Sequence, residues 1–218
     1  MELKNKKIVF LGDSITAGSG IADKENGIYW QQLAHLSGAE CIGYGISGHR
    51  IAKQHAPEVT AGRVPFADRV EQMDADADIV VVFGGTNDFG HGDAPIGSFD
   101  DRTTDTFYGA LHVLCLKLIE RYPEAQLVFM TPTHRTSENE GPFNEYHVRL
   151  STNLEGYVNI IQEVCAHYAI PVLDLFRTSG IQPLVPALRE RYMPDGLHPN
   201  DAGAERIARK LLGFLQTL

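Results

Sequence analysis

A serine, a histidine and an aspartate in this chain have the types and the surroundings that nucleophilic catalysis requires. Ser14 lies in the stretch IVFLGDSITAGSG, directly after an apolar run, and Asp195 and His198 stand three residues apart in MPDGLHPNDAG. A serine hydroxyl is a weak nucleophile at neutral pH and needs an adjacent base, which is most often histidine. That base needs a carboxylate to hold its tautomer and to stabilise the imidazolium. We therefore predict that Ser14 is the nucleophile, His198 the base and Asp195 the group that orients His198.

Attack on an ester carbonyl also creates an oxyanion, which requires hydrogen-bond donors that are already in place. The predicted donors are the backbone N–H groups of Ser14 and Gly48 and the side-chain amide of Asn87, since each follows an apolar run. Gly48 has no Cβ, which lets the backbone approach a substrate closely. A helix beginning just after Ser14 would add positive potential. A histidine base must be neutral to accept a proton, so activity should fall at acid pH.

Each of these residues also has a purely structural interpretation. Serine caps helices, an asparagine after a strand forms an Asx turn, and an Asp–His pair in a loop can be a surface contact of little energy. Asp88 is then either a turn residue or the group that fixes its loop. Three further residues close to the oxyanion donors are predicted to line the substrate mouth, with loop or rim positions as the alternative: His49, Arg50 and His91.

Metal and nucleotide chemistry are poorly supported by the sequence. The nine histidines lack the spacing of a ligand set, so no metal is predicted. The stretch GDSITAGSG has no lysine near its second glycine, which a phosphate-binding Walker loop requires. No cofactor is expected.

Short apolar runs alternate with longer stretches of helical periodicity, which predicts an α/β fold with a mainly parallel sheet. Helices are predicted over residues 103–123, 144–168 and 200–218, the last capped by Asn200 or Asp201. The carboxyl ends of parallel strands meet at one edge of the sheet, where ligands bind. Five strands are predicted: residues 7–12, 41–46, 78–85, 125–132 and 170–176.

Length and composition are typical of one soluble domain spanning residues 1–218. The net charge of −9, from 28 acidic and 19 basic residues, disfavours nucleic acid and anionic membranes as partners. No apolar run is long enough to span a bilayer or to serve as a signal peptide. The cysteines, an odd set, are interpreted as buried free thiols, and a cytoplasmic location is expected: Cys41, Cys115 and Cys165.

The chain resembles the SGNH hydrolases, also called the GDSL family, which are serine esterases and lipases. GDSITAG carries the first block of that family at Ser14, GTND carries the third at Asn87, and DGLH carries the last at Asp195 and His198. The resemblance implies a flavodoxin-like three-layer α/β/α sandwich and the same assignment of nucleophile, base and oxyanion donors. The second block departs from the pattern: family members often place asparagine five residues before the oxyanion glycine, whereas this chain has Gly43 there.

The expected reaction is hydrolysis of a small-molecule ester through an acyl-enzyme. Loop 88–102 mixes aromatic, small and acidic residues, which favours short acyl groups such as acetyl, on carbohydrates for example, over a long acyl chain. A lysophospholipase or thioesterase is the alternative within the family. A catalytically idle binding module on the same fold is the alternative from another class, and the presence of both Ser14 and His198 argues against it. The sequence leaves the oligomeric state open.

Overall fold

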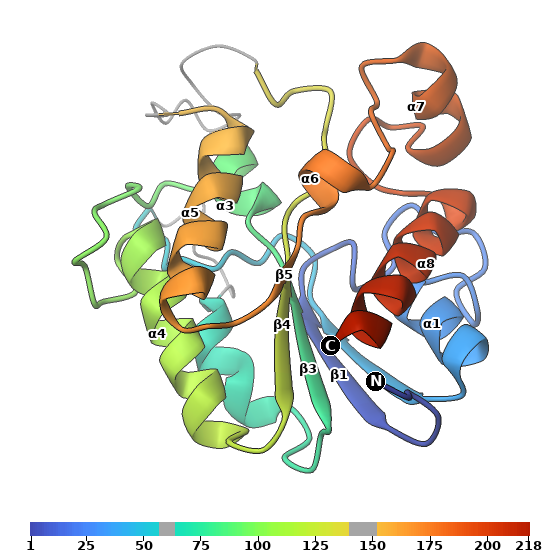
Figure 1. Cartoon of the computed structure of the whole chain (residues 1–218). Coiled ribbons are helices and arrows are strands. Elements are labelled where there is room, and N and C mark those ends of the chain that lie inside the picture. Colours follow the sequence, from blue (N-terminus) through green and yellow to red (C-terminus); the bar gives the residue numbers. More distant parts are fainter. Residues whose placement is uncertain (57–63, 140–151) are drawn as a thin grey trace.

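A computed structural model describes residues 1–56, 64–139 and 152–218, and its centre is a parallel β-sheet (Figure 1). Within these residues the sheet has five strands in the order β2-β1-β3-β4-β5, and every neighbouring pair is parallel. This strand order is that of flavodoxin-like folds, in which the order reverses between β1 and β3. The predicted α/β class, the parallel sheet and its five strands are confirmed.

The strands are short and apolar because helices cover both faces of the sheet. All of β3 (Ile79–Phe83) is buried, as are five of the six residues of β1 (Lys7–Gly12). β4 (Gln126–Met130) lies beyond β3, and β2 (Glu40–Gly45), at one edge, is only half-buried. β5 (Val172–Leu173) is much shorter than the predicted 170–176, because Asp174 caps the helix that follows it.

Alternate residues of each strand belong to two separate cores. Val9, Leu11 and Val82 face the core beneath η1 (Phe66–Gln72), α4 (Phe107–Arg121) and α5 (Leu154–His167). Ile8, Phe10 and Val81 face the core beneath α1 (Tyr29–Ser37) and α8 (Asp201–Thr217). Figure 1 shows these two helical layers on opposite sides of the sheet. The three-layer α/β/α arrangement is therefore confirmed.

Side chains cap two of the predicted helices, although α4 begins at Phe107, later than the predicted residue 103. The side chain of Thr106 caps α4, and that of Asn200 caps α8, each accepting a hydrogen bond from the N–H three residues on. Of the predicted helix 144–168, residues 144–151 lie outside the described residues, and the rest corresponds to α5. Helix α1 was not predicted; its sequence YWQQLAHLS buries only Tyr29 and Leu33 and so has a weak apolar stripe.

Three short helices lie at the carboxyl edge of the sheet: α3 (Thr86–His91), α6 (Leu175–Thr178) and α7 (Pro186–Tyr192). Figure 1 shows all three above the strand ends, with α3 beside α5 and α7 above the start of α8. Helix α3 overlaps the predicted loop 88–102, and α6 overlaps the end of the predicted strand 170–176, so neither helix was expected. The stretch LVPALRERY, residues 184–192, has the short helical pattern that α7 adopts.

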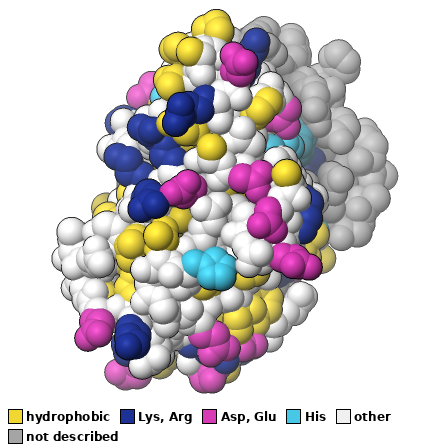
Figure 2. All heavy atoms as spheres, turned by 90° about the vertical axis from the view of Figure 1, so that its right-hand side faces the viewer, with side chains coloured by type: hydrophobic (Ala, Val, Ile, Leu, Met, Phe, Trp, Pro, Cys, Tyr) yellow, Lys and Arg dark blue, Asp and Glu magenta, His cyan; other side chains and the backbone are white. Residues whose placement is uncertain are grey.

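The surface and the thiols complete the description. Figure 2 shows the face on the right of Figure 1, where acidic and basic side chains both occur, so this face is not uniformly of one charge. Cys115 and Cys165 are buried and Cys41 is half-buried, and all three are free thiols. In the described part of the chain, no helix combines the length and the apolar character that crossing a membrane would need.

Candidate active site

The parallel sheet brings the predicted site residues to one edge. Asp13 and Ser14 directly follow β1, Gly48 lies three residues beyond β2, and Asn87 is in the first turn of α3, just beyond β3. Because β1 lies between β2 and β3, Ser14 stands between the other two segments. This is the position where the strand order reverses and where ligands bind in open α/β sheets.

The serine, histidine and aspartate form a hydrogen-bonded chain. Ser14 Oγ lies 3.0 Å from His198 Nε2, and His198 Nδ1 lies 2.7 Å from Asp195 Oδ2. These distances are those expected for a nucleophile, its base and the group that orients the base. Ser14 is 7% exposed, whereas the side chains of His198 and Asp195 are 23% and 54% exposed.

Local contacts shape the loop that carries Asp195 and His198. Asp195 Oδ1 accepts hydrogen bonds from the N–H groups of Leu197, at 2.9 Å, and His198, at 2.7 Å. Partial burial opposes ionisation of Asp195, but these N–H groups and the His198 ring outweigh it and hold its pKa below the ordinary value. Gly196 between them has a φ of 81°, which suits glycine. Asp195 therefore remains a carboxylate facing the imidazole.

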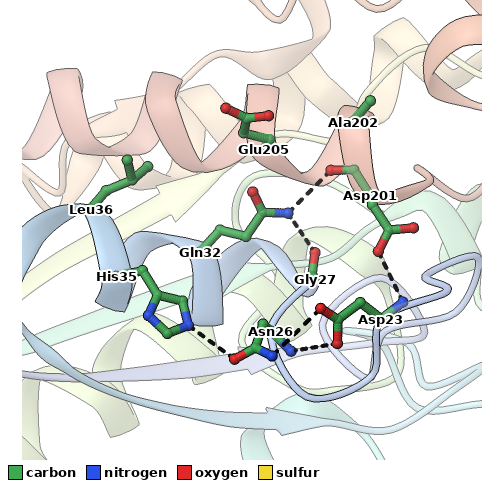
Figure 3. A pocket seen from close by; sticks show the side chains of 9 residues that line it. All are labelled: Asp23, Asn26, Gly27, Gln32, His35, Leu36, Asp201, Ala202 and Glu205. Carbon is green, nitrogen blue, oxygen red and sulfur yellow. Dashed lines mark hydrogen bonds between the residues drawn. The ribbon is translucent and has the colours of Figure 1, made fainter.

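The segment around Gly20 packs closely against His198 and Pro199. Gly20 has a φ of 85°, and a Cβ there would lie 2.7 Å from Pro199 O and 2.9 Å from His198 Cβ. The loop after Gly20 is tied to the start of α8, because the Asp201 carboxylate accepts hydrogen bonds from the N–H groups of Ala22 and Asp23 at 3.0 Å. Figure 3 shows Asp201 and Asp23 among the residues that line a surface pocket of about 470 Å³ between α1 and α8. Asp201 was predicted only as a possible cap, and its contacts lie too far apart in the chain for sequence reasoning to find.

Ser14 sits on hydrogen-bonded turns, not at the start of a helix, so the prediction of a helix just after it is wrong. Ala17 N–H donates to Asp13 O and Ser19 N–H donates to Ser14 O, and the positive φ of Gly18, 88°, prevents helical continuation. Any positive potential at Ser14 therefore comes from the turn's own N–H groups. Asp13 Oδ1 accepts the N–H of Ile15 at 3.0 Å, and burial raises the pKa of Asp13 to about 7.

A buried carboxylate and an amide hold the loop that carries Gly48. Asn87 Nδ2 donates to His49 O at 3.0 Å, which places the amide beside Gly48, and an amide nitrogen carries a second N–H. Asp88 accepts the N–H groups of Ile51, at 3.0 Å, and Ala52, at 2.9 Å. Asp88 thus fixes the Gly48 loop, which decides between the two roles left open for it; its burial raises its pKa to about 6.

The mouth predicted from His49, Arg50 and His91 fits the structure poorly. Arg50 is 1% exposed and its Nη2 donates to His91 O at 2.5 Å, so its guanidinium lies in the interior, close to Asp88. Arg50 is therefore not a rim residue: its side chain points into the interior, where it binds the His91 carbonyl and lies near the Asp88 carboxyl group. His49 is also buried, and His91 is half-buried.

Loop 131–139 contacts both halves of the site and was not predicted to do so. Arg135 Nη1 donates to Thr86 O at 3.2 Å, next to Asn87. Thr136 N–H donates to Gly196 O at 2.9 Å, between Asp195 and His198. The loop follows β4, and no motif in its sequence marks these contacts, which depend on the position of β4 next to β3.

A family model and a known relative match most of the chain. The model of the GDSL-like lipase/acylhydrolase family matches residues 10–206. A GDSL lipase of Mycobacterium tuberculosis is 24% identical over 220 residues, which is 97% of this chain and 82% of that protein. The matched region includes every residue from Ser14 to His198.

Solved structures show the same fold. A protein from Lactobacillus plantarum is 35% identical with a TM-score of 0.84, over 99% of this chain and 98% of that one. An acetyl xylan esterase, AlAXEase, is 23% identical with a TM-score of 0.64, over 96% of this chain and 99% of that one.

Proposed function

This chain belongs to the GDSL-like lipase/acylhydrolase family and is accordingly a carboxylic ester hydrolase, and from that premise we propose that it works through an acyl-enzyme formed on Ser14. The observation that carries this proposal is the continuous set of contacts from Ser14 Oγ through the His198 ring to Asp195. A hydroxyl 3.0 Å from an imidazole nitrogen is placed to lose its proton as it attacks.

The reaction follows in two halves. Ser14 Oγ bonds to the ester carbonyl carbon as its proton passes to His198 Nε2, and the carbonyl oxygen becomes an oxyanion bound by the N–H groups of Ser14 and Gly48 and by Asn87. The oxyanion collapses, and the alcohol leaves with the proton from His198. Water then attacks the acyl group, again giving its proton to His198, and the acid departs as Ser14 regains a proton. Asp195 stabilises the imidazolium in both halves.

We propose short acyl groups as the substrate class, with acetyl esters of carbohydrates as the leading example. The support for this choice is that an acetyl xylan esterase has the same fold. One fold hosts many substrates, so the substrate class must be tested directly. Loop 88–102 no longer supports it: Phe89 is buried against Tyr157, and Phe99 packs on His112 and His167, so these aromatics serve packing. Lysophospholipase or thioesterase activity remains the alternative.

The test is hydrolysis of p-nitrophenyl acetate, butyrate and octanoate at pH 8 by the wild-type protein and by Ser14→Ala. We expect the variant to lose activity by a factor on the order of 10⁶ in kcat, since no other group replaces the nucleophile. We expect acetate and butyrate to have the higher kcat/KM. A fluorophosphonate probe should add its mass to Ser14 in the wild type only.

The other outcomes are equally informative. A preference for octanoate would replace the short-acyl proposal by the lysophospholipase alternative. Absence of both turnover and labelling would indicate an idle binding module. Equal turnover by both proteins would show that Ser14 is not the nucleophile.

A further inference from the structure

The loop that carries Gly48 lacks the asparagine that the family pattern often places five residues earlier. Gly43 stands there, and a Cβ at that position would lie 2.5 Å from the Trp30 indole. Trp30 Nε1 in turn donates to Thr16 O at 2.9 Å, in the turn after Ser14. Because the indole occupies this space, an asparagine side chain does not fit at position 43. The question is then which side chain supports the ends of β1 and β2 in this chain.

A buried arginine joins them. Arg69, from η1, donates from Nη1 to Gly12 O at 2.9 Å and from Nη2 to Tyr44 O. Gly12 is the last residue of β1 and Tyr44 the penultimate residue of β2, so one planar guanidinium bridges the two strand ends. Gly12 O also accepts the N–H of Ile46 at 3.2 Å. The fork geometry of arginine suits two acceptors in this way, whereas the single ammonium of lysine does not.

The two carbonyl groups that Arg69 binds lie a few residues before the predicted oxyanion donors in the chain. Ser14 is two residues beyond Gly12, and Gly48 is four residues beyond Tyr44. Moving either carbonyl would therefore move an N–H group that must meet the oxyanion. A displacement of about 1 Å at a catalytic group can cost on the order of 10²-fold in rate.

The charge of Arg69 is kept although the residue is 2% exposed. Burial lowers its pKa to about 10, with the nearby Asp13 carboxylate opposing the change, so the guanidinium remains a cation at neutral pH. The guanidinium itself lies over the Phe66 ring, with Cζ 5.3 Å from the ring centroid. Burying a cation is costly unless its N–H groups are satisfied, and here two backbone carbonyls accept hydrogen bonds from the guanidinium and offset part of that cost.

We propose that Arg69 is a positioning residue for the oxyanion hole: it fixes the ends of β1 and β2 so that the N–H groups of Ser14 and Gly48 point at one oxygen. This inference rests on the proposed acyl-enzyme function. It assigns Arg69 no contact with substrate, so its effect should appear in the rate of acylation and not in substrate binding.

The experiment compares Arg69→Met and Arg69→Lys with a matched control, Arg121→Met. Arg121 also binds two backbone carbonyls, Glu71 O at 3.3 Å and Met73 O at 2.7 Å, but at the opposite, amino-terminal edge of the sheet. Turnover of p-nitrophenyl acetate and the inhibition constant of a trifluoromethyl ketone, which forms an oxyanion when Ser14 adds to it, are measured well below each variant's Tm.

For Arg69→Met we expect kcat to fall on the order of 10²-fold, as for loss of one oxyanion donor, with KM within about threefold of wild type. The inhibition constant should rise in proportion. Arg69→Lys should show a smaller loss of the same kind, because an ammonium keeps the charge but reaches one carbonyl. Arg121→Met should lower Tm and leave both kcat and the inhibition constant unchanged.

Wild-type kcat in folded Arg69→Met would overturn the proposal, as would a loss that appears only in KM. If Arg69→Met does not fold, Arg69→Lys decides: unchanged kcat and inhibition would overturn the two-carbonyl bridge. Failure of the acyl-enzyme proposal is seen separately, since Ser14→Ala would then keep its activity whatever the Arg69 variants do.

Discussion

The two flanks of Ser14 are built in opposite ways. On the base side, Asp195 and His198 belong to one partly exposed loop, and among the described residues the Asp195 carboxylate accepts hydrogen bonds from Leu197 and His198, two and three positions away. On the oxyanion side, Gly48 lies in the loop after β2 and Asn87 lies in α3. Two buried side chains hold this side through contacts between distant segments: Asp88 binds the loop after Gly48, and Arg69 binds the end of β1.

The difference follows from what each flank must do. A base accepts and returns protons, and an imidazolium that forms near solvent is stabilised by water as well as by Asp195. An oxyanion hole must hold N–H groups in place before charge develops, and dry surroundings strengthen their interaction with that charge. We therefore expect the base side to tolerate loss of its carboxylate better than the oxyanion side tolerates loss of its supports.

The largest effect should come from His198→Gln, and comparing it with Asp195→Ala tests the base side. Glutamine fills similar space but cannot act as a base, so kcat should fall on the order of 10⁴-fold or more. Asp195→Ala should keep roughly ten times or more of the kcat of His198→Gln, because the exposed loop admits water beside the imidazole. Steady-state kinetics with p-nitrophenyl acetate at pH 8 measures both.

Circular dichroism and Tm establish that both variants are folded. Equal losses in His198→Gln and Asp195→Ala would contradict the comparison, because they would show that solvent gives the imidazolium no help.

The next effect in size should come from Asn87→Ala on the oxyanion side. Losing this donor should lower kcat by about 10²–10³-fold with little change in KM, since the amide meets the oxygen most strongly once it is charged. Asn153→Ala is the matched control: Asn153 caps α5 by accepting the N–H of Gly156, and its loss should cost only about 1 kcal/mol of stability. A kcat for Asn87→Ala within threefold of wild type would remove Asn87 from the oxyanion hole.

The smallest effect should appear in the pH dependence of the free energy of unfolding. It concerns Asp13, the buried aspartate next to Ser14. Burial raises the pKa of Asp13 to about 7, whereas an unfolded aspartate titrates near pH ~3.9. Between these values the folded state holds a proton that the unfolded state has lost. Asp13 therefore makes the free energy of unfolding decrease as pH rises through this window, by at most about 1.4 kcal/mol per pH unit.

Urea unfolding of Asp13→Asn between pH 5 and pH 8 measures this contribution, and we expect a shallower decrease with pH than in the wild type. Asp101→Asn serves as the control. The Ser98 N–H and the Thr106 hydroxyl hold the pKa of Asp101 below its ordinary value, so Asp101 is ionised in both states across the window. An unchanged slope in Asp13→Asn would mean that Asp13 is charged in the folded protein.

Much of the fold follows from local patterns in the sequence. The buried strands β1, β3 and β4 read as continuous apolar runs, and Thr106 and Asn200 mark the starts of α4 and α8. Predictions of secondary structure failed where the local sequence pattern was weak, or where a backbone conformation or side-chain contact that the pattern does not reveal ended the element. The turn after Ser14 looks helical until Gly18 adopts a positive φ, and Asp174 ends β5 early by capping α6.

By itself the sequence determined the class of fold and the members of the candidate site, because a nucleophile, a base and its carboxylate must be particular residue types and because strand ends in a parallel sheet meet at one edge. Only the tertiary structure decided how that site is held. Arg69 reaches Gly12 and Tyr44 across 57 and 25 residues, and Asp88 reaches Ile51 across 37. Arg50, predicted at the substrate mouth, is buried instead, and its burial likewise depends on how distant segments pack together. Hydrogen bonds of this range depend on the folded positions of distant segments, and no local pattern encodes them.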